Sequence, residues 1–178
     1  MKKKTKKSER LLKNREGIYS VAAILLIFDQ LIKLLVRSKV SLMEEISVIP
    51  GFFSIYHLEN TGGAFSIFSG ATIVLIVLSV LVLAFIHCYV ITDEKMTKWR
   101  IFGLGIVIGG IVGNLVDRLL YGAVVDYLSF NIFGYEFPVF NLADVGITIG
   151  FLILAINILR RDVNEFRDKS RDGRGEEN

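Results

Sequence analysis

The chain has 178 residues, 52% of them hydrophobic, and a mean hydropathy of +0.52. A soluble domain of this length is usually less apolar, and the long uncharged runs of this chain are typical of a membrane protein. The formal net charge of +3 sums segregated blocks, because the first fifteen residues alone hold eight Lys or Arg. A basic tail could bind nucleic acid, but here it adjoins an apolar run. Control of membrane topology is the better interpretation, and we predict no nucleic-acid partner.

Four apolar segments approach the roughly 20 residues that a helix needs to cross the hydrocarbon core. Backbone groups in lipid must be satisfied within their own segment, so helices are the expected solution. The predicted fold is therefore an all-α membrane protein, a bundle of four transmembrane helices. We predict spans at about 18–36, 71–92, 99–116 and 141–159.

The placement of Lys and Arg predicts the orientation of these spans. Basic residues concentrate in a tail over 1–17, in the short connection 93–100 and in a charged tail over 161–178. The connections 37–70 and 117–140 contain few. We therefore predict that both tails are cytoplasmic, that a membrane domain covers 18–160, and that 37–70 and 117–140 are loops on the outer face.

The first outer connection has the composition of β structure. Residues 46–58 are rich in β-branched and aromatic side chains and contain a Pro50-Gly51 turn, which predicts a short strand pair. Residues 131–137 add another strand or turn. A small extracytoplasmic β element is expected beside the helices.

The unusual polar residues all fall at one predicted depth, on the outer side. Asp29 and Lys33 are four apart and share one helix face. Polar residues with unrelated roles would be expected in both leaflets, so we predict a single site at the outer membrane boundary. Its candidate members are Asp29, Lys33, Asn60, Asn114, Asp117, Arg118, Asp126, Asn141 and Asp144.

Glycines recur every four residues in the third span, at Gly105, Gly109 and Gly113. They line one helix face and predict a close approach of a neighbouring helix. That approach would draw Asn114 into the bundle.

Each polar residue also has a structural interpretation. Asp144 could cap the fourth helix and Asp126 could face water in a loop, although ionisable groups beside spans are functional by default. Asp117 and Arg118 could form an ion pair or contact substrate, and both readings stay open. Asp29 and Lys33 are better explained as a structural or positioning pair.

The asparagines Asn60, Asn114 and Asn141 fit caps and turns, but three at one depth favour a role in supporting the site. No His/Cys cluster has metal-ligand spacing, so no metal is predicted.

Five blocks along the chain resemble those of lipoprotein signal peptidase, also called signal peptidase II, a bacterial membrane aspartic peptidase family. Any one block is weak, but five in matching order are specific. The family usually has Phe where this chain has Tyr127. The blocks run from Asp29 to Lys33, Asn60 to Phe65, Gly109 to Arg118, Gly122 to Tyr127 and Phe140 to Asp144.

The resemblance implies an endopeptidase that removes the signal peptide of diacylglyceryl-modified prolipoproteins, cutting on the amino side of the modified cysteine. It implies Asp126 and Asp144 as the catalytic dyad and the other candidate residues as substrate-binding or supporting groups. It implies no cofactor, a location in the bacterial inner membrane with the active site near the outer face, and membrane lipids as surroundings of a monomer.

Three rival functions remain to be weighed. A proton-coupled transporter would use intramembrane acids as a relay, but it predicts acids spread through the membrane depth. A non-catalytic membrane subunit would use the glycine stripe for assembly. A metallohydrolase would use the aspartates as metal ligands.

Overall fold

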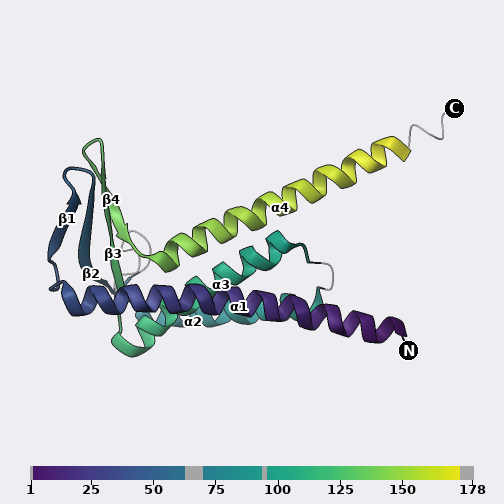
Figure 1. The fold of residues 1–178 in the computed structure, drawn as a ribbon, viewed down its shortest axis with the longest axis horizontal. Helices are drawn as coiled ribbons and strands as arrows, with labels where there is room; N and C mark the ends of the chain where they lie inside the picture. Colours follow the sequence, from purple (N-terminus) through teal and green to yellow (C-terminus); the bar gives the residue numbers. More distant parts are fainter. Residues whose placement is uncertain (1, 63–69, 94–95, 173–178) are drawn as a thin grey trace.

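In the computed structural model, the described residues are 2–62, 70–93 and 96–172; residues 63–65 of the second motif block lie outside them. Figure 1 shows four helices and a small sheet at one end of them. The elements in chain order are α1 (Lys2–Lys39), β1 (Glu45–Ile49), β2 (Phe53–Asn60), α2 (Thr72–Thr92), α3 (Lys98–Tyr121), β3 (Val124–Ile132), β4 (Tyr135–Phe140) and α4 (Leu142–Asp172).

The four helices are long and apolar enough to cross a membrane, as predicted. Large apolar side chains face outward from them: Phe28 is 58% exposed, Phe85 76% and Phe151 52%. Such extensive apolar exposure suits lipid rather than water. The start of α1 and the end of α4 lie at the end of the bundle opposite the sheet (Figure 1).

The helices extend beyond the predicted spans. The basic segment before residue 18 is helical and continuous with α1, and α4 continues to Asp172. The third helix continues past residue 116 to Tyr121, so Asp117 and Arg118 belong to its last turns rather than to a loop. The limits at residues 18 and 160 concern where the chain leaves the bilayer and stay predictions.

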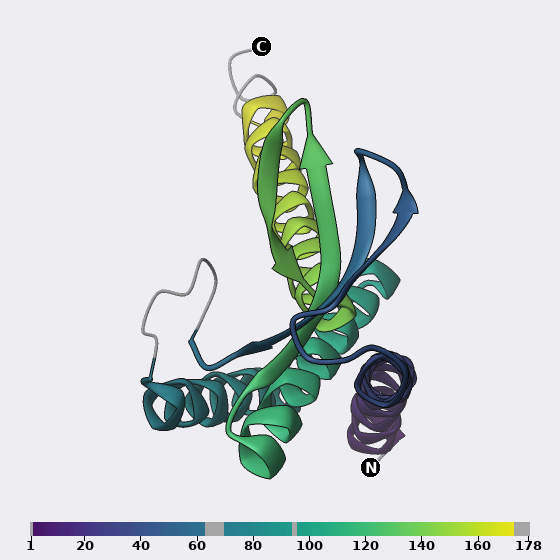
Figure 2. The same ribbon diagram turned by 90° about the vertical axis from the view of Figure 1, so that its left-hand side faces the viewer.

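Helix α3 lies between the other three helices, as Figure 2 shows from the sheet end. The predicted glycine stripe faces α1: a Cβ added at Gly109 would lie 2.6 Å from the Ala22 carbonyl oxygen. A second face, which the sequence analysis missed, meets α4, where a Cβ at Gly110 would lie 2.5 Å from the Ala143 carbonyl oxygen. Glycine at these positions lets both neighbouring helices pack backbone to backbone on α3.

The four strands form one antiparallel sheet in the order β1-β2-β3-β4. The predicted strand pair in 46–58 is confirmed, since β1 pairs with β2. Residues 131–137 contain the end of β3, a turn at Phe133 and Gly134, and the start of β4. Asp126 lies within β3, not in a loop, because α3 ends at Gly122 and the chain enters the sheet at once. Gly122 has φ of 75°, the left-handed conformation that commonly terminates helices.

Candidate active site

A cavity of about 510 Å³ lies where the sheet meets the start of α4. Asp126 from β3 and Asp144 from α4 both line it, together with Asn60, Asn114 and Arg118. Apolar residues of β4 and α4 form much of the remaining wall. The structure thus brings two aspartates from different elements to one hollow.

Asp126 is buried and holds a hydrogen bond on each carboxylate oxygen. Asn60 Nδ2 donates to one oxygen at 2.8 Å, and Asn141 Nδ2 donates to the other at 2.6 Å. Asn60 stands opposite Val124 in the pairing of β2 with β3, so Asn60 and Asp126 are diagonal neighbours on one face of the sheet. The strand register therefore sets this contact.

Asp144 is half-buried and sits in the first turn of α4. Its carboxylate accepts from Asn114 Nδ2 at 2.7 Å and from the Asn141 backbone N–H at 3.3 Å. In return, the Asp144 N–H donates to Asn141 Oδ1 at 3.0 Å. This reciprocal pair is a capping box, so the predicted capping role of Asp144 and its place in the cavity occur together.

The other free amides at the start of α4 are also taken by side chains. The Ala143 N–H donates to Asp29 Oδ1 at 3.0 Å, and the Leu142 N–H donates to the Tyr127 hydroxyl at 3.2 Å. Helix α1, strand β3 and helix α3 therefore all hold the turn that carries Asp144, through Asp29, Tyr127 and Asn114. Burial raises the pKa of Tyr127, which keeps its hydroxyl neutral. A phenylalanine at this position could not accept this bond.

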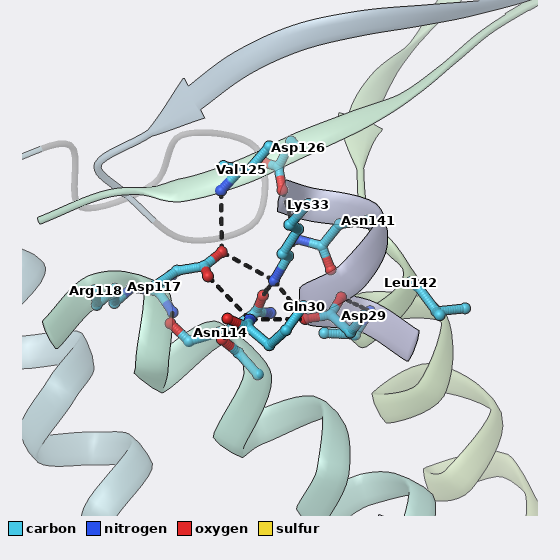
Figure 3. Close-up of polar contacts among 12 residues, drawn as sticks. Asp29, Gln30, Lys33, Asn114, Asp117, Arg118, Val125, Asp126, Asn141 and Leu142 are labelled. Atoms are coloured by element: carbon cyan, nitrogen blue, oxygen red, sulfur yellow. Dashed lines mark hydrogen bonds and ion pairs between the residues drawn. The ribbon is translucent and has the colours of Figure 1, made fainter. Parts of the chain in front are cut away.

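Next to the cavity lies a buried ion cluster, formed by Asp29, Lys33 and Asp117 (Figure 3). Lys33 Nζ lies 2.8 Å from Asp29 and 3.0 Å from Asp117, and no more than 3% of any of these side chains is exposed. Gln30 donates to Asp117 at 3.0 Å, and the Val125 N–H donates to it at 3.2 Å. Gln30 was missed by the sequence analysis, although an amide inside an apolar span was the signal for it.

Two asparagines connect the ion cluster to the aspartates. Asn114 Oδ1 accepts from Lys33 Nζ at 2.9 Å and from Asn141 Nδ2 at 3.2 Å. These two donors orient the Asn114 amide so that its Nδ2 faces Asp144. The Lys33 ammonium therefore orients the Asn114 amide, whose neutral Nδ2 donates a hydrogen bond into the cavity.

Arg118 lines the cavity but contacts backbone oxygens. Its Nη2 donates to the Gly62 carbonyl at 2.9 Å and its Nη1 to the Asn114 carbonyl at 3.3 Å. In the part of the chain that is described, the cationic partner of Asp117 is Lys33, so the adjacent Asp117–Arg118 ion pair considered above is not formed.

The environment of Asp126 favours its protonated form. Burial, followed by the charge of Asp144, raises the pKa of Asp126 to about 7, against the opposing hydrogen bonds from Asn60 and Asn141. Two neighbouring carboxyl groups of this kind titrate as a unit. Near neutral pH the pair can hold one proton, which supplies an acid and a base together.

A family model described as signal peptidase (SPase) II matches residues 21–160. The chain belongs to the signal peptidase II family. The resemblance noted from the sequence is thereby confirmed, and the protein is a membrane peptidase, a hydrolase.

Relatives and solved structures agree with this membership. The lipoprotein signal peptidase of Maridesulfovibrio salexigens is 37% identical over 149 residues, covering 81% of this chain and 94% of the relative. That of Staphylococcus aureus is 33% identical over 149 residues, covering 84% and 91%. Two solved structures described as bacterial membrane enzymes are each 32% identical to the chain. One has a TM-score of 0.77 and covers 83% of this chain and 90% of its own, and the other has 0.72 and covers 80% and 92%.

Proposed function

We propose that this enzyme is an aspartic endopeptidase that removes the signal peptide from diacylglyceryl-modified prolipoproteins. Cleavage falls on the amino side of the lipid-modified cysteine. The observation that carries the proposal is that Asp126 and Asp144, from separate elements, line one cavity and accept hydrogen bonds there from neutral amides. Relatives named lipoprotein signal peptidase support the substrate class.

The mechanism uses the single proton of the aspartate pair. The ionised carboxylate takes a proton from a water molecule while the oxygen of that water attacks the scissile carbonyl carbon. The protonated carboxyl donates to the carbonyl oxygen and stabilises the developing oxyanion. When the C–N bond breaks, the proton taken from water passes to the leaving amine.

The remaining site residues hold this pair in place. Asn60, Asn114 and Asn141 orient the carboxylates through the hydrogen bonds described above. Arg118 joins the segment at Gly62 to α3, beside the cavity. Asp29, Lys33 and Asp117 act as positioning residues, because they reach the aspartates only through α4, Asn114 or β3.

We further propose that both termini are cytoplasmic and that the cavity lies near the outer face of a bacterial inner membrane. The basic segments support this orientation, because they include the start of α1, the start of α3 and the end of α4, all away from the sheet (Figure 1). The substrate's acyl chains lie in the outer leaflet, against the apolar cavity wall that includes Phe140 and Ile149. The proposed enzyme acts as a monomer and needs no cofactor, because two carboxyl groups are sufficient to activate water for amide hydrolysis.

The test is cleavage of a lipid-modified preprotein by purified enzyme. Asp126→Asn and Asp144→Asn should each lower the cleavage rate by about 10³-fold or more, because each removes one half of an acid–base pair. Glu136→Gln, which changes an exposed acid of β4, is the matched control and should cleave normally. Thermal unfolding must confirm that each variant is folded. Normal cleavage by either aspartate variant would reject the proposal.

The same assay separates the metallohydrolase rival. Among the described residues no group of three or more His, Cys, Asp or Glu is arranged to hold a metal ion. Cleavage should therefore persist in a strong chelator. Membership in a peptidase family argues against the transporter and the non-catalytic subunit.

A further inference from the structure

A second cavity, of about 340 Å³, lies between α1 and α3 at the sheet end of the bundle. It shares no lining residue with the cavity of the aspartates. Its wall on α1 is an apolar stripe of Ile27, Leu31 and Leu34, which are 57%, 51% and 61% exposed. Their spacing places all three on one helix face, open to the surrounding lipid.

The polar end of this cavity is Arg37, at the end of α1. Its guanidinium lies over the Tyr121 ring, 3.4 Å from the centroid, and only 18% of the side chain is exposed. The carboxylate of Glu59 approaches Arg37 Nη2 to 3.7 Å, which is too far for a hydrogen bond. Nη2 is buried and has no hydrogen-bond partner within the described part of the chain.

A buried cationic donor without an acceptor is costly, and a charged acceptor satisfies it best. The base of the cavity does not compete for an anion. Lys33 and Asp117 also line it, and the ion cluster to which they belong has two carboxylates for one ammonium. An anion is therefore attracted to the Arg37 end alone.

We propose that this cavity binds an anionic glycerophospholipid. The phosphate accepts from Arg37 at the level of the headgroups, where the first span ends, and an acyl chain follows Leu34, Leu31 and Ile27 toward the bilayer centre. The chemistry requires both parts, because a diacylglycerol would fill the stripe and leave Arg37 Nη2 without a hydrogen-bond acceptor. This site is additional to the proposed peptidase site and does not depend on it.

The test measures lipid binding in maltoside detergent, with a tryptophan reporter in the cavity. The chain has a single tryptophan, Trp99, at the opposite end of α3. Tyr121→Trp combined with Trp99→Phe places the only indole under Arg37. Phosphatidylglycerol with brominated acyl chains should quench its fluorescence at a concentration at least about tenfold lower than brominated diacylglycerol does.

Arg37→Gln, introduced into the tryptophan reporter variant, should abolish the preference for phosphatidylglycerol over diacylglycerol. Lys39→Gln, which removes an exposed cation of the same helix that does not line the cavity, should preserve it. Glu59→Gln removes the nearest competing carboxylate and should preserve or strengthen it. Equal quenching by the two lipids, or equal loss in the Arg37 and Lys39 variants, would overturn the proposal.

The readout is independent of catalysis. The same preference is expected when Asp126→Asn is added, so a failure of the lipid site and a failure of the peptidase site are distinguished. Loss of the preference in Glu59→Gln would also count against the site. The Glu59 side chain is 41% exposed, so we expect this variant to fold normally.

Discussion

Two carboxylate pairs lie side by side at the sheet end of this molecule, and they are built in opposite ways. Asp29 and Asp117 share the ammonium of Lys33 and are closed off by further donors. Asp126 and Asp144 receive only neutral N–H donors and line a cavity. Asn114 touches both pairs, through its oxygen on one side and its nitrogen on the other.

The difference shows how burial can serve either stability or chemistry. A buried carboxylate held by a cation fixes the backbone around it. A buried carboxylate that meets only neutral amides and a second acid can exchange a proton near neutral pH. The structural interpretation of an intramembrane acid therefore fits the contacts of Asp29 and Asp117 better than those of Asp126.

The largest effect is expected from removing the cation. Lys33→Met leaves two buried carboxylates without their ammonium and should lower the free energy of unfolding by about 3–5 kcal/mol. Lys39→Met, an exposed cation of the same helix, is the control. Adding Asp29→Asn and Asp117→Asn to Lys33→Met should recover part of the loss, because neutral groups remain. Thermal unfolding measures all of these variants, and wild-type stability in Lys33→Met would show that the cluster is not structural.

A smaller effect is expected from pH on the aspartate pair. Asp126 is protonated below its pKa of about 7, so the acid form is lost as pH rises through that value. The rate of cleavage should fall about fiftyfold between pH 7 and pH 9, as expected for loss of one proton. Cleavage of a lipid-modified preprotein across this range checks it. A rate that stays constant to pH 9 would mean that the aspartate pair does not supply the catalytic proton.

The smallest effect is expected at Tyr127, which supports the pair from behind. Tyr127→Phe leaves the Leu142 N–H without its acceptor and should destabilise the protein by about 1 kcal/mol. Tyr135→Phe, at an exposed position of β4, is the matched control and should have no effect. Equal melting temperatures for the two variants would show that the Tyr127 hydroxyl contributes nothing to the fold.

Features that repeat along the chain were predictable from the sequence. Apolar runs of spanning length located the four helices, and the spacing of Gly105, Gly109 and Gly113 gave a close-packed face of α3. The polar residues were also predicted to lie at one end of the bundle, because the direction of each helix fixes the end at which a residue lies. The structure brings these residues together at the sheet end.

Contacts that depend on how elements rotate against each other were not predictable. Asp29 and the Ala143 amide are 114 residues apart, and periodicity gives a helix face without saying which neighbour it meets. The α4-facing glycines were missed because Gly103 and Gly110 recur at a spacing of seven, which the four-residue pattern hid. Asp126 was expected in a loop because it falls in the connection 117–140 between two predicted spans, whereas pairing with β2 makes its segment a strand.

The anchoring of α4 has a consequence for synthesis. Its opening turn is held by Asp29 from the first helix and by Tyr127 from the sheet, both of which leave the ribosome earlier. Asp144 therefore reaches the cavity only when α4 packs against helices and strands made before it. We expect a nascent chain to have no peptidase activity until then. An incomplete copy would therefore not cleave the proteins inserted beside it.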